Sequence, residues 1–125
     1  MKLDHAQQNN GTLRLYAHCA KSPEGGVTLF GLNLDSKPAS FKLLPRPLRS
    51  SRIEHYILSA RTLTSKTIYL NGEEMRLLED ETTLPILRPM KTGPMNAMYM
   101  KGHQMAFWVF PEAGLTICSS KGEIN

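Results

Sequence analysis

Apolar and polar side chains alternate with a period of two along most of this chain, whereas helical spacing is nearly absent. Residues 12–20 place leucine, alanine and cysteine on one face and Arg14, Tyr16 and His18 on the other. Alternation of this kind is typical of a β-strand with one buried face. Residues 27–34, VTLFGLNL, are apolar at both sets of positions, which predicts a central strand covered on two sides.

Turn residues separate the expected strands at intervals of about ten residues. The clearest turn is Asn71-Gly72, because this dipeptide accepts the positive φ angles of a type I′ hairpin between two alternating arms. Residues 79–94 are rich in turn residues and carry three prolines, which predicts extended irregular chain over the surface. Further strands are expected at residues 40–44, 53–59, 97–110 and 115–119.

This pattern predicts an all-β protein. The regular spacing of short strands favours an antiparallel sandwich or a small barrel, and we expect an antiparallel two-sheet β-sandwich of about eight strands. The sandwich should occupy residues 12–119 as one domain. A polar lead at residues 1–11 precedes it, and a short tail at residues 120–125 follows it.

The composition fits a folded domain, because 41% of the 125 residues are hydrophobic and 21% are charged. No apolar run approaches the 18 or so residues that cross a membrane, so we expect no membrane span. The first residues, MKLDHAQQNNG, lack the apolar stretch of a secretory signal. The net charge of +4 is modest and aromatic residues are not interleaved with Lys and Arg, so we expect no nucleic-acid partner.

The two cysteines, Cys19 and Cys118, are the first candidates for chemistry. His18 adjoins Cys19, but successive residues of a strand point to opposite faces, so His18 is not placed to act as a base for the thiol. Two cysteines without CxxC or HxxxH spacing also make a poor zinc site. Two interpretations remain open: a pair of buried free thiols, or one long disulfide worth roughly 4–5 kcal/mol on the chain-entropy model. Because both cysteines fall on apolar faces of the first and last expected strands, the disulfide is favoured.

No set of residues forms a credible catalytic centre, and we expect neither a metal nor a cofactor. The acidic run at residues 79–81 is typical of a solvated turn, and the chain has no Gly-rich phosphate loop and no GxSxG serine. Arg46, Arg49 and Arg52 form the one basic cluster, which fits either a solvated loop or a site for the sulfate or carboxylate groups of a glycan. Asn10 begins the only N-glycosylation sequon, which beside a disulfide points to an extracellular or lumenal protein.

Methionines gather towards the C-terminal end of the chain. Met98 and Met100 share one face at alternating spacing. They fit either core positions or an apolar, Met-rich docking surface for a partner protein.

Several segments, in this order, resemble one known family. They are LRLYAHCAK, GGVTLFGLNL, SKTIYLNGEEMRLLED, TLPILRP and MAFWVFPEAGLTIC. Together they are similar to the C-terminal β-sandwich of heparanase-like proteins, glycoside hydrolase family 79. The resemblance covers nearly the whole chain, from about residue 13 to residue 118. Each segment alone is weakly specific, whereas their order and spacing are quite specific.

The resemblance implies that the sandwich packs against a catalytic (β/α)8 barrel, which cleaves glucuronic-acid-containing glycans such as heparan sulfate through two glutamates of its own. It also implies a disulfide between an early strand and the final strand, which transfers to Cys19 and Cys118. No glutamate of this chain inherits a catalytic role. The implied function is a non-catalytic accessory sandwich of a secreted or lysosomal endo-β-glucuronidase, which braces the barrel and supports folding and export. The alternative is a free-standing module that binds a sulfated glycan or a protein.

The sequence departs from the family pattern in several respects, and two of them bear on the fold and its edges. The barrel is missing, so the chain is either a fragment of an active or inactive family member or a free-standing product. In the family, a strand from the far N-terminal part completes the sandwich, whereas residues 3–10 are polar here. We therefore expect an exposed or incompletely covered sheet edge, which is a liability for aggregation.

Overall fold

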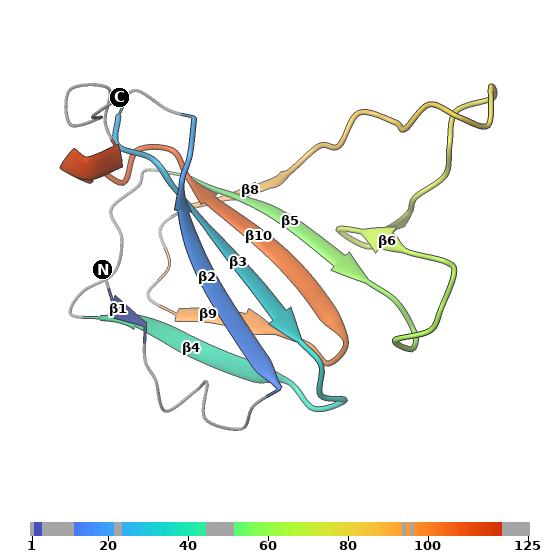
Figure 1. The fold of residues 1–125 in the computed structure, drawn as a ribbon, viewed down its shortest axis with the longest axis horizontal. Coiled ribbons are helices and arrows are strands. Elements are labelled where there is room, and N and C mark those ends of the chain that lie inside the picture. The colour runs from blue at the N-terminus through green and yellow to red at the C-terminus, as the bar shows by residue number, and fades with distance from the viewer. Residues whose placement is uncertain are drawn as a thin grey trace.

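The structure is a computed structural model that describes residues 2–3, 12–21, 24–44, 52–93, 95 and 97–118. Within these residues the chain forms β-strands and one short 3-10 helix (Figure 1). The elements are β1 (Lys2–Leu3), β2 (Leu13–Cys19), β3 (Val27–Asn33), β4 (Ala39–Leu44), β5 (Ile53–Ser59), β6 (Tyr69–Leu70), β7 (Glu73–Glu74), β8 (Met90–Thr92), β9 (Ala97–Met100), β10 (Gln104–Phe110) and η2 (Thr116–Cys118).

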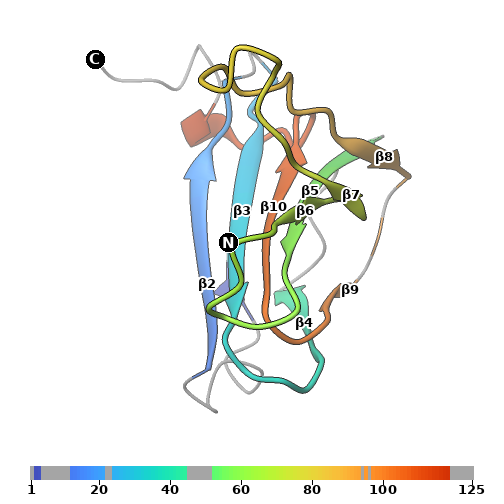
Figure 2. The same cartoon turned by 90° about the vertical axis from the view of Figure 1, so that its right-hand side faces the viewer.

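The strands form two sheets, each with antiparallel pairing. The larger sheet has the order β2-β3-β10-β5-β6-β7, with β8 also paired to β5, and the smaller sheet has the order β1-β4-β9. Figure 2 shows β2, β3, β10 and β5 side by side in the larger sheet, and Figure 1 shows β4 and β9 apart from these strands, below them in the view. The predicted all-β sandwich is therefore confirmed.

Most of the longer strands coincide with the alternating segments of the sequence. The strand expected at residues 53–59 is β5 with the same bounds. The hairpin at Asn71-Gly72 also forms, with φ angles of 49° and 87° as a type I′ turn requires. Its arms, however, pair over only two residues each, in β6 and β7. Residues 79–89 are irregular as expected, but the next three residues form β8 against β5.

The core lies between the two sheets. Trp108 at the centre of β10 and Leu29 beside it on β3 face Phe41 of β4 and the methionines Met98 and Met100 of β9. The rings of Trp108 and Phe41 pack edge to face, with their centroids 5.5 Å apart. Both methionines are fully buried. They therefore belong to the core, and the hypothesis of a Met-rich docking surface at these positions is wrong.

The outer face of the larger sheet differs from the prediction for residues 27–34. Side chains of β3 alternate between fully buried and half-buried positions, so only one face is covered completely. On the outer face Phe30 stacks between Tyr16 of β2 and Phe107 of β10, with ring centroids 5.9 and 4.7 Å apart. The apolar outer residues are thus explained by cross-strand pairs that stabilise the sheet rather than by a second covering layer.

The larger sheet ends in β2 on one side and in β7 on the other, as far as the described residues go. Of residues 3–10, the expected poor substitute for the missing family strand, Leu3 belongs to β1, which pairs with β4. Residues 4–10 lie outside the described residues. The described part of the chain also contains no helix long and apolar enough to cross a membrane.

Candidate functional site: the disulfide and the projecting arm

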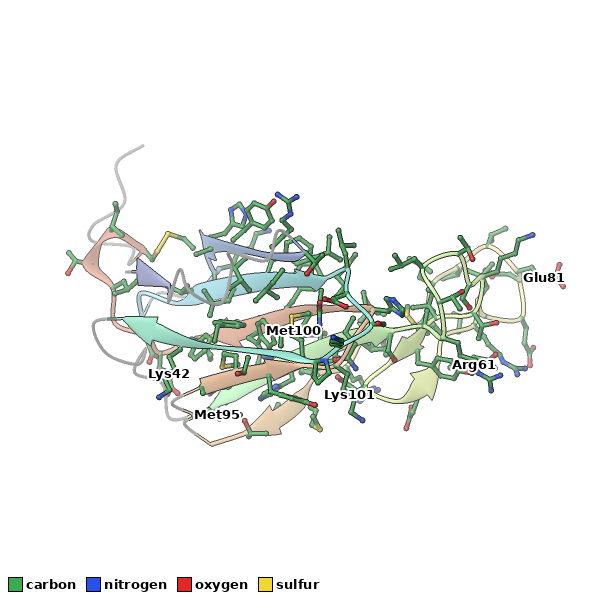
Figure 3. The ribbon with its side chains drawn as sticks, turned by 90° about the horizontal axis from the view of Figure 1, so that it is seen from below. Lys42, Arg61, Glu81, Met95, Met100 and Lys101 are labelled. Carbon is green, nitrogen blue, oxygen red and sulfur yellow. A yellow bond between two sulfur atoms is a disulfide. The ribbon has the colours of Figure 1, made fainter. Side chains whose placement is uncertain are left out.

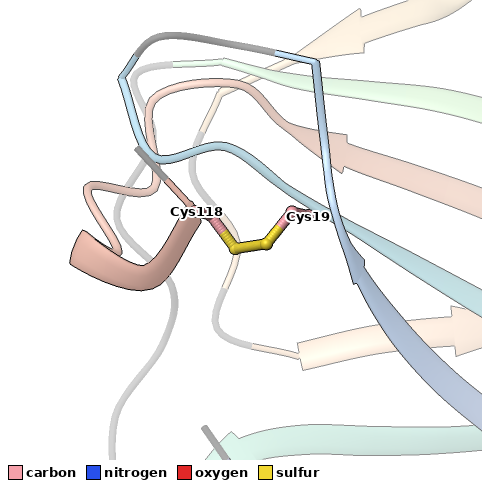
Figure 4. Close-up of a disulfide and its surroundings, with 2 residues drawn as sticks. All are labelled: Cys19 and Cys118. Carbon is pink, nitrogen blue, oxygen red and sulfur yellow. A yellow bond between two sulfur atoms is a disulfide. The ribbon is translucent and has the colours of Figure 1, made fainter. Parts of the chain in front are cut away.

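A disulfide joins the end of β2 to the end of η2. Cys19 and Cys118 are separated by 99 positions in sequence, and their Cα atoms lie 5.2 Å apart (Figure 4). Cys19 is exposed and Cys118 is half-buried, so the bond lies at the rim of the sandwich rather than inside the core. Because it closes nearly the whole domain into one loop, it constrains the unfolded chain strongly.

The segment that carries Cys118 was expected to be a strand, and this prediction is wrong. The amide of Gly114 donates to the carbonyl of Glu24 at 2.9 Å, and that of Leu115 donates to the carbonyl of Gly25 at 3.2 Å. The amide of Cys118 then donates back to the carbonyl of Leu115, which closes the 3-10 turn. The backbone of this segment is therefore hydrogen-bonded to the loop between β2 and β3, instead of pairing with a neighbouring strand.

Gly25 makes this approach possible. It has a φ of 68°, and a Cβ atom at this position would lie 2.5 Å from the backbone nitrogen and oxygen of Leu115. Only glycine combines this left-handed backbone with such close contact. The Gly-Gly pair that marks the loop in the sequence is therefore also the surface on which the C-terminal segment rests.

His18 has no role in the chemistry of the cysteine. It is exposed on β2, next to Cys19, whose sulfur is already bonded to Cys118. Within the described ranges, no group of three or more His, Cys, Asp or Glu side chains could hold a metal ion.

Three of the residues predicted to contact glycans or carry a modification lie outside the described residues: Asn10, Arg46 and Arg49. The third arginine of the cluster, Arg52, has a side chain that is 48% exposed. Its Nε atom lies 3.4 Å from Oε2 of Glu54, so this cation already faces a carboxylate.

Residues 61–89, called here the apolar arm, connect β5 to β8 (Figure 1). They include the β6–β7 hairpin, which is the end of the larger sheet, and the rest of the arm extends away from β2, β3 and β10. In Figure 3, Arg61 and Glu81 lie at the opposite end of the molecule from the disulfide. The arm carries seven of the twelve exposed large hydrophobic side chains of the described residues. They are Leu63, Ile68, Leu77, Leu78, Leu84, Ile86 and Leu87. The sequence predicts a hairpin around Asn71-Gly72 and irregular surface chain over residues 79–94, but it does not identify this apolar surface. The signal that could have done so is leucine and isoleucine among turn residues.

Asn71 fixes the base of the apolar arm. Its Oδ1 accepts from the amide of Ile57 at 2.9 Å, while its Nδ2 donates to the carbonyls of His55 at 3.0 Å and Arg88 at 3.3 Å. The amide of Asn71 also donates to the carbonyl of Ile57 at 2.8 Å. One side chain thus connects the hairpin turn, β5 and the returning chain.

A cavity of about 580 Å³ lies between the β6–β7 hairpin and the returning chain of the apolar arm. Its apolar lining comes from Leu70 and Met75 on the hairpin side and from Ile86, Leu87 and Met90 on the other. Arg76, which also borders the cavity, is paired with Glu74, with Nε 2.6 Å from Oε2. The cavity therefore combines aliphatic surface with the polar side chains Asn71, Glu73, Glu74, Arg76 and Arg88 at its border.

His55 is the one buried titratable group of the described core. It is 4% exposed, and its Nε2 lies 2.8 Å from Oγ1 of Thr92 on β8. Burial lowers the pKa of His55 below its usual value of 6.5, because the charged imidazole loses hydration. The folded state therefore favours the neutral ring, and the unfolded state binds the proton more readily.

We expect the stability of the protein to fall as the pH decreases below about 6.5, since the unfolded chain then takes up a proton that the folded chain resists. The free energy of unfolding, measured with urea between pH 7.5 and pH 5, should decrease by at most about 1.4 kcal/mol per pH unit from this residue. His55→Gln should flatten the dependence, and His18→Gln, at an exposed position on β2, is the matched control. Parallel curves for wild type and His55→Gln would refute this role.

These features define the class of the protein: a β-sandwich module stapled by one long disulfide, with an anchored apolar arm. The chain is 33% identical over 113 residues to heparanase of Gallus gallus. The aligned region covers 84% of this chain and 21% of that protein. The chain is also 27% identical over 128 aligned positions to hyaluronoglucuronidase of Hirudo nipponia. This alignment covers 94% of the chain and 25% of that protein. No protein-family model matches the chain.

The chain is thus homologous to the C-terminal domain of heparanase, as the resemblance of its segments indicated. It spans only about a fifth to a quarter of the length of these relatives. The similarity is therefore to a part of a heparanase-like protein and not to its whole length.

Proposed function

We propose that this chain is the accessory β-sandwich of a heparanase-like glycoside hydrolase, and that it braces a catalytic (β/α)8 barrel and supports its folding and export. The observation that carries the proposal is the extent of the similarity. Two proteins whose names denote glycan-cleaving enzymes match this chain over 84% and 94% of its length, but over only 21% and 25% of theirs. On this proposal, the module is a small part of the enzyme and supports the larger, catalytic part.

The residues of the chain support a structural role in the parent protein. The disulfide fits the oxidising compartments of a secreted or lysosomal protein. The sequon at Asn10 would carry a glycan in the same compartments. The glutamates of the apolar arm are all exposed: Glu73 and Glu74 lie on β7 at the border of the cavity, and Glu79 and Glu81 lie in turns. The parent enzyme would take glucuronic-acid-containing glycans as its substrate, and its two catalytic glutamates would lie in the barrel.

The test of this role is an assay of the purified 125-residue chain on heparan sulfate and on hyaluronan. We expect no release of reducing ends from either glycan, because cleavage needs two carboxylates on either side of the substrate and the proposal places both in the barrel. Release above the level of a heat-denatured sample would contradict the proposal.

The second candidate function is binding of a sulfated glycan by Arg46, Arg49 and Arg52. The ion pair of Arg52 with Glu54 speaks against a strong contribution from that residue. We therefore expect the chain to elute from immobilised heparin at or below the physiological salt concentration. Replacing all three arginines by alanine should change the elution little, with Lys37→Ala, Lys42→Ala and Lys66→Ala together as a charge-matched control. Retention well above physiological salt that only the arginine variant loses would favour the glycan-binding function instead.

A further inference from the structure

The apolar arm concentrates the exposed aliphatic surface of the described residues. Ile86 is 80% exposed, Leu84 is 63% exposed and Leu63 is 61% exposed. Scattered exposed leucines are ordinary on a protein surface, but seven in one segment of 29 residues are not. A surface of this kind marks a site of contact with another apolar surface.

Hydrogen bonds fix the arm in place, which distinguishes it from an unsupported loop. Asn71 connects its base to β5 and to Arg88. Further out, the amide of Met75 donates to the carbonyl of Ile68 at 2.8 Å, and that of Leu78 donates to the carbonyl of Thr83 at 2.8 Å. Backbone hydrogen bonds therefore hold the hairpin and the turn at residues 78–83 in place, which lowers the entropy cost of binding.

The chemistry of the arm selects a protein as its partner. Its exposed large side chains are Leu and Ile, which offer no aromatic face for a sugar ring, and its charges are balanced. Residues 61–89 contain four Lys and Arg against five Asp and Glu, whereas the whole chain carries a net charge of +4. Thr83 and Thr82 donate hydrogen bonds that lower the pKa of Asp80 to about 2, so this carboxylate stays charged near the tip. The arm therefore offers no excess of positive charge to a sulfated glycan or an anionic membrane.

We infer that the apolar arm is the surface through which this module contacts the remainder of its parent protein, on a part of that protein that presents aliphatic side chains. This inference rests on the proposed function. The two relatives of the chain are four to five times as long as the segment that matches it. A parent protein of that length would supply a large polypeptide to cover the arm. The cavity of about 580 Å³ beside Ile86 and Met75 offers a recess for one apolar side chain or more of that partner.

The experiment uses the full 125-residue chain and a defined probe. The probe is the part of Gallus gallus heparanase that this chain does not match, co-expressed with an affinity-tagged copy of the chain. Ile86→Asp and Leu84→Asp place a charge on the arm. Ile117→Asp is the matched control, because Ile117 is 77% exposed but lies in η2, next to the disulfide. Exposed substitutions of this kind leave the fold stable, which circular dichroism and thermal unfolding of each variant verify.

We expect the wild-type chain and Ile117→Asp to capture the probe equally, and each arm variant to bind it at least tenfold more weakly. Equal capture by all four chains would overturn the inference about the arm and leave the proposed function intact. Failure of the wild-type chain to capture any probe would overturn both. A wild-type chain that captures nothing but forms a dimer, which Ile86→Asp dissociates, would assign the arm to a second copy and also overturn the inference.

Discussion

Replacing Trp108 by alanine should remove a large part of the stability of this protein. Trp108 is 1% exposed at the centre of β10, between Leu29 on β3 and His55 on β5. Its ring packs against Phe41 of the second sheet and closes over Gly31, where a Cβ atom would lie 3.0 Å from Cζ3 of the tryptophan. The substitution therefore opens a cavity between the sheets and breaks the contact that joins them. Such changes cost about 3–5 kcal/mol, out of about 5–15 kcal/mol for a typical domain.

Chemical unfolding in urea measures this effect, with Tyr99→Ala as the control. Tyr99 lies on β9 and is 54% exposed, so its truncation should change the free energy of unfolding by about 0.5 kcal/mol or less. Trp108→Phe keeps an aromatic ring in the core and should fall between the two. A loss of less than about 1 kcal/mol for Trp108→Ala would contradict the assignment of this residue to the centre of the core.

The second large effect is expected from removal of the disulfide. The double variant Cys19→Ala, Cys118→Ala frees a loop of about 100 residues in the unfolded chain, which the chain-entropy model values at about 4.7 kcal/mol. Measured losses for small secreted domains are typically 2–5 kcal/mol. The wild-type protein in reductant should unfold at the same urea concentration as the double variant without it.

The comparison with reductant distinguishes the effect of breaking the disulfide from the effect of replacing the cysteine side chains. If the cysteines were free thiols, the wild-type protein would react with a thiol-specific alkylating agent before reduction, and reductant would not change its stability. Either result would refute the bond between the end of β2 and η2. The intact bond should instead appear as a mass about 2 Da lower than that of the reduced chain, from the two hydrogens lost on oxidation.

The alternating segments could be translated into strands because the hydrophobic effect acts on each of them locally. β5 and β10 each place every second side chain against the facing sheet, and a one-residue shift of register would expose the buried set. The same reasoning located the turn at Asn71-Gly72, whose positive φ angles follow from these two residues alone. The two-sheet sandwich could therefore be predicted from the sequence.

Features that depend on contacts between distant segments could not be predicted in this way. Residues 115–119 alternate like a strand, but Gly25 allows them to approach a loop far away in sequence, and the loop carbonyls take the place of a ladder partner. Likewise, Leu84 and Ile86 looked like loop residues, since their neighbours are prolines and threonines. Their importance depends on the arm leaving the sheets at β5, which only the three-dimensional arrangement shows.

The central claim is that this sandwich is one part of a heparanase-like enzyme. The most direct measurement is the sequence of the full-length messenger RNA that encodes these 125 residues. We predict that its reading frame continues upstream into a (β/α)8 barrel with two glutamates placed for retaining hydrolysis. A reading frame that encodes these residues alone, translated from Met1 and ending at Asn125, would contradict the account.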